Sequence, residues 1–443
     1  MASAAAMATD SRDLSPGQRQ GYTEVDAGKR QRRGGDPVQR RRRGFRAAST
    51  APPSCSDLAP FSSFSSSLRP LFADLELPCP ELLPSGQIEI SRRGLVSPVA
   101  GRGEMAEKVQ VPWVALWVPT PYCLAAHVYI DVISELRRES SGGGTSTDNN
   151  DDNKSLGVIP GLSMMRISDL PKELIDDQDT SRSACMLREV GRVLPRGTAA
   201  VVMNSFAEVT PTPLMADLKS KFKMLLQVGC LAVSFPPLPL PSSSTSDTTG
   251  CLTWLDAREP RSVAYICFGT VAMPSPSELS AIGEALESTK TPFLWSIKES
   301  AMAFLPEGLQ ERTREYGKFV PWAPQAQVLS HLACGVYVTH CGYISMFESV
   351  VGGVPMVCKP FWADNMMNGR MIEEVWGIGV KVKDGTITKT GIEMALEVVL
   401  RGEDGKEMRK KAGELRERLV EAAGPNGIAD ADFKVLVKLI STS

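Results

Sequence analysis

The 443-residue sequence has few of the features that mark several broad protein classes. Its ten cysteines include no C-x-x-C pair and it holds only three histidines, which argues against a zinc or disulfide scaffold and for free thiols in a reducing compartment. It contains no run of 18 apolar residues, which a membrane helix needs, and its first thirty residues have no signal-peptide core. We therefore expect a cytoplasmic protein without a membrane span.

An excess of one charge sign is also missing. Lysine and arginine number 49 against 51 acidic residues, a net charge of −2, which argues against a surface built throughout for nucleic acid or anionic membrane. What is present is 42% apolar residues, enough for a large core, and a length that suits two to three domains.

The N-terminal segment differs in composition from the rest. Residues 1–70 are rich in Ala, Ser, Pro and Arg, and the stretch 29–46 holds nine basic residues and one acidic residue. Such a composition predicts a disordered tail. A nuclear signal, an RNA-binding arm and a transit peptide are alternatives to a plain solvated tail, but only one aromatic residue, Phe45, is interleaved with the arginines and no amphipathic stripe accompanies them.

The remaining chain predicts an α/β protein with two units. Residues 71–234 form the first, with a strand at 109–118, a helix at 124–139, and a helix followed by a strand within 187–204; the Pro- and Ser-rich stretch 235–249 is a linker. Residues 250–425 alternate short apolar strands with helices, which indicates a doubly wound parallel sheet. Its expected strands are 262–269, 293–297, 319–322, 335–341 and 354–359, and its expected helices are 275–289, 326–332, 345–351 and 365–375. Two helices are expected within 407–440, and residues 426–443 form a C-terminal helical unit.

One strand–turn–helix segment carries residues suited to phosphate binding. His340 follows an apolar strand, Gly342 permits close backbone approach, and the N–H groups of Ile344 and Ser345 open a helix. Glu348 could accept hydrogen bonds from ribose hydroxyls. Taken alone, His340 more often indicates a satisfied core histidine, and Ser345 with Glu348 a plain capping box.

The frame around this segment is more specific. It begins with Trp322-Ala323-Pro324-Gln325, where an exposed indole offers a stacking face, and ends with Asp364-Asn365, whose carboxylate and amide suit sugar hydroxyls. These 44 residues, here called the donor box, resemble the signature box of the plant UDP-glycosyltransferases, with WAPQ, HCGYIS, the glutamate and the acid–amide pair at the family's separations.

The resemblance extends from about Glu104 to the C-terminus and is strongest to flavonoid and anthocyanidin 3-O-glucosyltransferases. It implies a GT-B fold: two facing Rossmann-like domains, the first for the acceptor and the second for the UDP-sugar, with the last helix packing back on the first. It also implies inverting transfer of glucose from UDP-glucose to the 3-hydroxyl of a flavonol or anthocyanidin. The expected protein is a monomer that needs no cofactor or metal.

The resemblance assigns donor-site roles to particular residues. Trp322 stacks on uracil beside Ala323 and Gln325, and Glu348 holds the ribose. The remaining residues contact the diphosphate (Thr270, His340, Ser345), line the nucleotide site (Ser296) or hold the sugar (Asp364, Asn365).

Three positions of the donor box depart from the family. Tyr343 replaces a tryptophan, which the site can absorb. Ile344 replaces an asparagine, which removes one hydrogen bond to phosphate, roughly 1 kcal/mol. Asn365 replaces a glutamine and has a shorter reach. These changes predict weakened donor binding.

The family's catalytic dyad is not found. The family uses a histidine after the first strand as general base, oriented by an aspartate. Here the histidines are His127, His331 and His340, none of which matches that position, and Val96 stands where the aspartate is expected. Nothing in residues 1–100 resembles the family's opening strand and acceptor pocket, so the first domain is expected to be incomplete.

Three interpretations follow. The first hundred residues are unrelated translation from a truncated or mis-spliced gene, or the protein is a non-catalytic nucleotide-sugar binder, or a relocated base such as Glu104 or Asp131 acts in an active enzyme. The first is preferred because the opening residues are rich in Arg, Ser and Pro.

The triplet Asp430-Ala431-Asp432 matches the D-x-D of metal-dependent transferases. Because it follows a Gly-rich turn and begins the last helix, helix capping explains it. No metal site is expected there.

Overall fold

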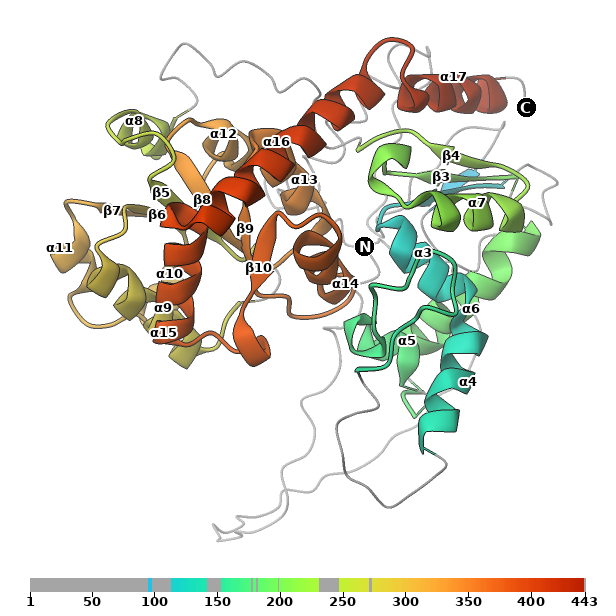
Figure 1. Cartoon of the computed structure of the whole chain (residues 1–443), viewed down its shortest axis with the longest axis horizontal. Helices are drawn as coiled ribbons and strands as arrows, with labels where there is room; N and C mark the ends of the chain where they lie inside the picture. Colours follow the sequence, from blue (N-terminus) through green and yellow to red (C-terminus); the bar gives the residue numbers. More distant parts are fainter. Residues whose placement is uncertain are drawn as a thin grey trace, which may run out of the picture.

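The computed structural model describes residues 95–97, 113–141, 153–176, 178–180, 182–197, 199–230, 247–270 and 273–441. The predicted tail 1–70, Glu104 and nearly all of the linker 235–249 lie outside these residues. Within them, the chain forms two α/β units, each built on a parallel sheet (Figure 1).

The first sheet has the order β1-β2-β3-β4, with every neighbouring pair parallel. Its strands are β1 (Leu95–Ser97), β2 (Trp113–Trp117), β3 (Ala200–Met203) and β4 (Leu225–Gln227). The longer helices of this unit are α3 (Pro121–Val128), α4 (Ile130–Ser141), α6 (Arg182–Gly197) and α7 (Thr212–Lys221); the short ones are η4 (Ile167–Asp169), α5 (Lys172–Ile175) and η5 (Ala207–Val209). The edge strand β1 was not anticipated from the sequence.

The helix expected at 124–139 is two helices. The chain leaves helical geometry at Tyr129, whose φ is −101° and ψ 20°. The Tyr129 hydroxyl donates to the Asp217 carboxylate of α7 at 2.8 Å, and Lys221 lies over its ring. This tertiary contact accompanies the break, and local periodicity carries no trace of it.

The second sheet has the order β10-β9-β8-β5-β6-β7, again parallel throughout. Its strands are β5 (Val263–Cys267), β6 (Phe293–Ser296), β7 (Gly317–Val320), β8 (Cys334–Thr339), β9 (Met356–Cys358) and β10 (Gly379–Lys381). Its helices are α8 (Cys251–Asp256), α9 (Pro276–Thr289), α10 (Glu299–Met302), α11 (Leu309–Thr313), α12 (Gln325–Ser330), α13 (Tyr343–Gly352), α14 (Asn365–Arg370) with the π-turn η7 (Met371–Val375), η8 (Lys383–Gly385) and α15 (Lys389–Leu396) with η9 (Glu397–Arg401). The predicted doubly wound sheet is confirmed, but β7 ends at Val320 and leaves Trp322 beyond the strand.

Local signals explain the well-predicted helix α9. The Ser275 side chain accepts a hydrogen bond from the Glu278 N–H, and the Glu278 carboxylate accepts one from the Ser275 N–H at 2.9 Å. Pro276 occupies the first turn. The apolar face of α9 packs on the core residues Ala264, Ile266, Phe293 and Trp295 of the sheet.

The C-terminal helices cross between the two units. Helix α16 (Glu403–Ala423) packs against α13 of the second sheet's unit, and α17 (Ile428–Ser441) lies beside β3 and β4 of the first (Figure 1). The Asp432 carboxylate of α17 accepts the Gln227 N–H of β4 at 2.7 Å. The last helix therefore packs against the sheet of the first unit. Among the described residues, no helix has the length and apolar character to cross a membrane.

Candidate functional site: the strand ends of the second sheet

The donor-box residues gather at one edge of the second sheet. Because its strands are parallel, their carboxyl ends share that edge, the usual place for a ligand in a doubly wound fold. The predicted residues follow these ends: Thr270 after β5, Ser296 at the end of β6, Trp322 and Ala323 after β7, His340 after β8, and Asp364 and Asn365 after β9. Gln325 opens α12, and Tyr343, Ile344, Ser345 and Glu348 lie on α13.

Trp322 and Ala323 differ in exposure. The Trp322 side chain is 60% exposed, whereas Ala323 is 5% exposed and packs in the main core. An exposed indole at the rim of a strand-end site leaves a large apolar face free for a flat ring. The geometry therefore suits the stacking role expected of Trp322.

Gln325 has more hydrogen-bond partners than any other predicted residue of the box. Its amide nitrogen donates to Ser345 Oγ at 3.0 Å and to Glu348 Oε2 at 2.6 Å. Its carbonyl oxygen accepts from the hydroxyls of Tyr265 (3.3 Å) and Tyr337 (3.0 Å), whose rings stack on each other. Gln325 therefore joins α12, α13, β5 and β8. Its expected role beside the base did not anticipate this network, because the tyrosines lie 60 and 12 residues away in sequence.

The same network sets the electrostatics of Glu348. Burial raises the pKa of its carboxyl group, and the Gln325 amide opposes that rise. A carboxylate held by one amide and otherwise short of donors can accept hydrogen bonds from vicinal hydroxyls. This is the chemistry expected of a ribose-binding residue.

His340 lies between two glycines that make room for its ring. A Cβ at Gly269 would come within 2.9 Å of His340 Cε1, and one at Gly342 within 2.4 Å of Nε2. Gly269 also has φ +77°, which favours glycine. Burial lowers the pKa of His340 to about 4, with the Cys267 backbone opposing. The ring is therefore neutral near pH 7 and can donate one N–H to an anion.

The turn after His340 has an unusual backbone. Cys341 has φ +65°, a conformation that non-glycine residues rarely adopt, and its N–H donates to Thr339 Oγ1 at 3.2 Å. Its carbonyl accepts from the Asn368 amide at 2.9 Å. These two bonds fix the loop that leads into α13.

Tyr343 and Ile344 lie at the start of α13 but face different surroundings. The buried Tyr343 donates its hydroxyl to the Asn204 carbonyl, just after β3 of the first sheet, and its ring lies 5.0 Å from that of Phe347. Ile344 is partly buried against the main core. Tyr343 thus contacts the first unit, and its predicted contact with the nucleotide stays a prediction.

Asp364 and Asn365 begin α14 after a strained residue, Ala363, with φ +53°. The Asp364 carboxylate accepts from Asn368 Nδ2 at 3.1 Å, and burial raises its pKa. The same Asn368 amide group holds the Cys341 carbonyl. Asn368 therefore links the β8 and β9 strand-end loops. Its i, i+4 spacing from Asp364 was the one sequence signal for this role.

Thr270 and Ser296 complete the edge on the β6 side. The Thr270 carbonyl accepts from Lys298 Nζ at 2.7 Å, which places an exposed ammonium beside the strand ends of β5 and β6. Ser296 hydrogen-bonds Cys267 at the end of β5. Lys298 was not anticipated from the sequence, although a cation here suits an anionic ligand.

The described residues supply no oriented histidine base at this edge. His127 hydrogen-bonds the Leu187 carbonyl through Nδ1 at 2.9 Å, and burial lowers its pKa to about 4. His331 pairs with Asp256 at 3.1 Å, but it precedes β8 and so lies at the opposite end of that strand.

Of the two carboxylates considered as substitute general bases, only Asp131 lies within the described residues. The exposed Asp131 pairs with Arg192 at 2.5 Å, which lowers the pKa of Asp131 and makes it a weaker base. Glu104 lies outside the described residues. The two D-x-D carboxylates have different partners. Asp430 accepts a hydrogen bond from Lys434 Nζ at 2.6 Å, and Asp432 accepts one from the Gln227 N–H.

A doubly wound sheet that carries the donor-box residues at its strand ends, together with a second parallel sheet, defines the GT-B class of sugar-nucleotide transferases. The sequence profile described as UDP-glucoronosyl and UDP-glucosyl transferase matches residues 241–415. The chain is 41% identical over 377 residues to the anthocyanidin 3-O-glucosyltransferase UFGT of Vitis vinifera, covering 82% of this chain and 80% of that protein. It is 42% identical over 340 residues to the flavonol 3-O-glucosyltransferase F3GT2 of Actinidia chinensis var. chinensis, covering 77% and 71%.

A solved structure agrees with these relatives. The crystal structure of UDP-glucose: anthocyanidin 3-O-glucosyltransferase in complex with UDP superposes with a TM-score of 0.72 at 35% identity, covering 89% of this chain and 84% of that one. The chain therefore belongs to the UDP-glucoronosyl and UDP-glucosyl transferase family, and by family it is a UDP-dependent glycosyltransferase.

Proposed function

We propose that the protein binds UDP-glucose at the strand ends of the second sheet and belongs functionally with enzymes that glucosylate the 3-hydroxyl of flavonols or anthocyanidins with inversion. The observation that carries this is the donor-box geometry: an exposed Trp322, a neutral His340 between glycines, and a partly buried Glu348 at one sheet edge. The names of the relatives support a flavonoid acceptor. They include both glucosyltransferases and galactosyltransferases, so glucose as the sugar is part of the proposal only.

The parts of the site correspond to parts of the donor. Trp322 would take the uracil, with Ala323 and Gln325 beside it, and Glu348 the ribose. His340, Ser345 and Thr270 would contact the diphosphate, as would the backbone N–H of Ile344, next to Tyr343 at the start of α13. Ser296 would line the nucleotide site. Asp364 and Asn365 would hold the sugar. The domain boundaries 71–234, 250–425 and 426–443 are proposed with this assignment, as is a cytosolic location, which the free described cysteines fit.

A second candidate function is a nucleotide-sugar-binding protein without transfer activity. The histidines favour it: His127 is bonded to the Leu187 carbonyl, His331 pairs with Asp256 at the opposite end of β8, and His340 is assigned to the diphosphate. Losing a positioned base typically costs about 10²- to 10⁴-fold in rate. We therefore expect sugar transfer at background level only.

Two measurements on the full chain separate these functions. Calorimetry with UDP and with UDP-glucose tests donor binding, and saturable binding of both is expected. A transfer assay with UDP-glucose and quercetin or cyanidin, run beside a chimera that carries the first domain of an active relative, tests chemistry. Turnover by the chimera alone supports the binding-only function, whereas robust turnover by the chain itself would exclude it. Absence of any nucleotide binding would overturn both.

A further inference from the structure

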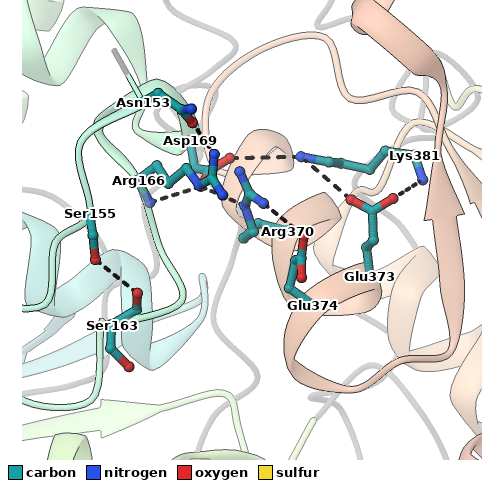
Figure 2. Close-up of polar contacts among 9 residues, drawn as sticks. All are labelled: Asn153, Ser155, Ser163, Arg166, Asp169, Arg370, Glu373, Glu374 and Lys381. Carbon is teal, nitrogen blue, oxygen red and sulfur yellow. Dashed lines mark hydrogen bonds and ion pairs between the residues drawn. The ribbon is translucent and has the colours of Figure 1, made fainter. Parts of the chain in front are cut away.

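A cluster of charged side chains joins the two units beside the donor box (Figure 2). Asp169, the last residue of η4 in the first unit, is 3% exposed, and Arg370, the last residue of α14 in the second, is 8% exposed. Arg370 Nε donates to Asp169 Oδ2 at 2.9 Å. They lie 201 residues apart in the sequence, so no local pattern indicates that they meet.

The Asp169 carboxylate is held from several sides. Oδ2 also accepts the Arg166 N–H at 2.9 Å, and Oδ1 lies 3.9 Å from Lys381 Nζ on β10. The second unit balances its own charges around the pair: Arg370 reaches Glu374 at 3.1 Å, and Lys381 lies 3.8 Å from Glu373. Removing one partner of a nearly buried pair leaves the other charge buried without a counter-charge, which is costly. The contact therefore fixes the position of α14 relative to η4.

Helix α14 links this pair to the sugar end of the proposed donor site. The helix has six residues, at about 1.5 Å of rise each, with Asp364 just before its first residue and Arg370 at its last. Asn368, between them, binds both Asp364 and the Cys341 carbonyl. A shift of Arg370 would therefore move the residues that face the sugar.

The other end of α14 also approaches the first unit. The Asp364 carboxylate raises the pKa of the buried Cys123 thiol on α3, in addition to the larger effect of burial, which places the carboxylate near the start of that helix. The Arg370 end of α14 is thus bound to the first unit by an ion pair, whereas the Asp364 end acts on that unit through its charge, which adds to the effect of burial on the Cys123 thiol.

We propose that Asp169 and Arg370 are positioning residues: their interdomain ion pair holds α14 so that Asp364 and Asn365 meet the sugar of the bound donor. This inference rests on the proposed donor function. The inference distinguishes the two halves of the donor, because the uracil and ribose residues lie between β7 and α12, on α12 and on α13, and do not contact the pair. Loss of the pair should therefore weaken binding of the sugar and leave binding of the nucleotide unchanged.

The test compares UDP with UDP-glucose by calorimetry on the full chain. In Asp169→Asn, we expect UDP affinity within about twofold of wild type and the affinity for UDP-glucose reduced about tenfold, the equivalent of one or two hydrogen bonds. Arg370→Lys keeps the charge and should lose about threefold or less. The double variant Asp169→Leu/Arg370→Met removes both buried charges together, which proteins often tolerate, and should show the same selective loss.

The matched control is Asp432→Asn, which breaks a different interdomain contact, that of α17 with Gln227. It should leave the ratio of the two affinities unchanged. Equal weakening of both ligands in Asp169→Asn, or a wild-type ratio in both Asp169→Asn and the double variant, would overturn the inference. Wild-type protein that binds neither ligand would instead overturn the proposed function on which it rests.

Discussion

Replacing Gln325 by leucine tests the hydrogen-bond network beneath the donor site. Leucine has a similar size and leaves little cavity, so the change removes polar contacts rather than packing. Four hydrogen bonds are lost, two donated to Ser345 and Glu348 and two accepted from buried tyrosine hydroxyls. Gln325 is therefore expected to matter for stability as much as for binding.

The magnitude follows from the character of each bond. The bond to the Glu348 carboxylate involves a charged acceptor, worth about 1.5–3 kcal/mol, and each neutral bond is worth about 1 kcal/mol. Tyr337 retains the Cys267 carbonyl at 3.3 Å, which offsets part of its loss. We expect Gln325→Leu to lower the free energy of unfolding by about 3–5 kcal/mol, a large share of the about 5–15 kcal/mol typical of a protein.

The variant should also change the pH dependence of nucleotide binding. The Gln325 amide keeps the raised pKa of Glu348 from rising further, so its loss raises that pKa again. Ribose hydroxyls donate to the ionised carboxylate, and UDP affinity should therefore fall with decreasing pH, with a higher midpoint in the variant than in wild type. Urea denaturation and calorimetry from pH 4 to 8 measure both effects. Wild-type stability together with an unshifted midpoint would refute the reasoning.

Three further changes probe the site and its surroundings. Trp322→Ala should leave stability within about 0.5 kcal/mol, because the indole is 60% exposed, and weaken UDP binding by about 1–3 kcal/mol in calorimetry; equal affinity would contradict the stacking role. Ile344→Asn should tighten UDP-glucose binding by about 1 kcal/mol if its side chain reaches the phosphate, and an unchanged affinity would place residue 344 elsewhere. Burial lowers the pKa of His127 to about 4, while an unfolded histidine titrates near 6.5, so its contribution to stability is complete above pH 6.5 and is lost as pH falls to 4. His127→Gln should remove about 3 kcal/mol of that pH dependence in denaturation experiments, and an unchanged pH profile would show that His127 titrates normally in the folded protein.

The second unit was predictable because its signals are local. Short apolar runs alternate with capped helices, and α9 has proline, a capping box and an amphipathic face within fifteen residues. Boundaries were less accurate where tertiary packing decides them. Trp322 has strand propensity, yet β7 ends at Val320, and the helix around Tyr129 breaks where its hydroxyl meets Asp217.

The gathering of the donor-box residues at one edge of the sheet was predictable, but their contacts were not. His340 and Asp364 follow strands of one parallel sheet, and the carboxyl ends of such strands share an edge. Spacing could not show that Gln325 bridges two buried tyrosines, or that Tyr343 donates to the Asn204 backbone across the molecule. These partners lie on other strands or in the other unit, and no periodic pattern encodes them.

Under the proposed function, donor binding and proton removal from the acceptor would depend on different units of the molecule. The hydrogen bonds of Gln325 and Asn368 hold the proposed donor site together within the second unit, while Tyr343 and Arg370 connect it to the first unit through the Asn204 carbonyl and Asp169. Proton removal from an acceptor needs a base held on the first unit, where the only described histidine, His127, is buried, neutral and turned to the Leu187 carbonyl. Under the proposed function, a nucleotide sugar would therefore be held at the second unit, while the described residues of the first unit offer no histidine placed to deprotonate an acceptor.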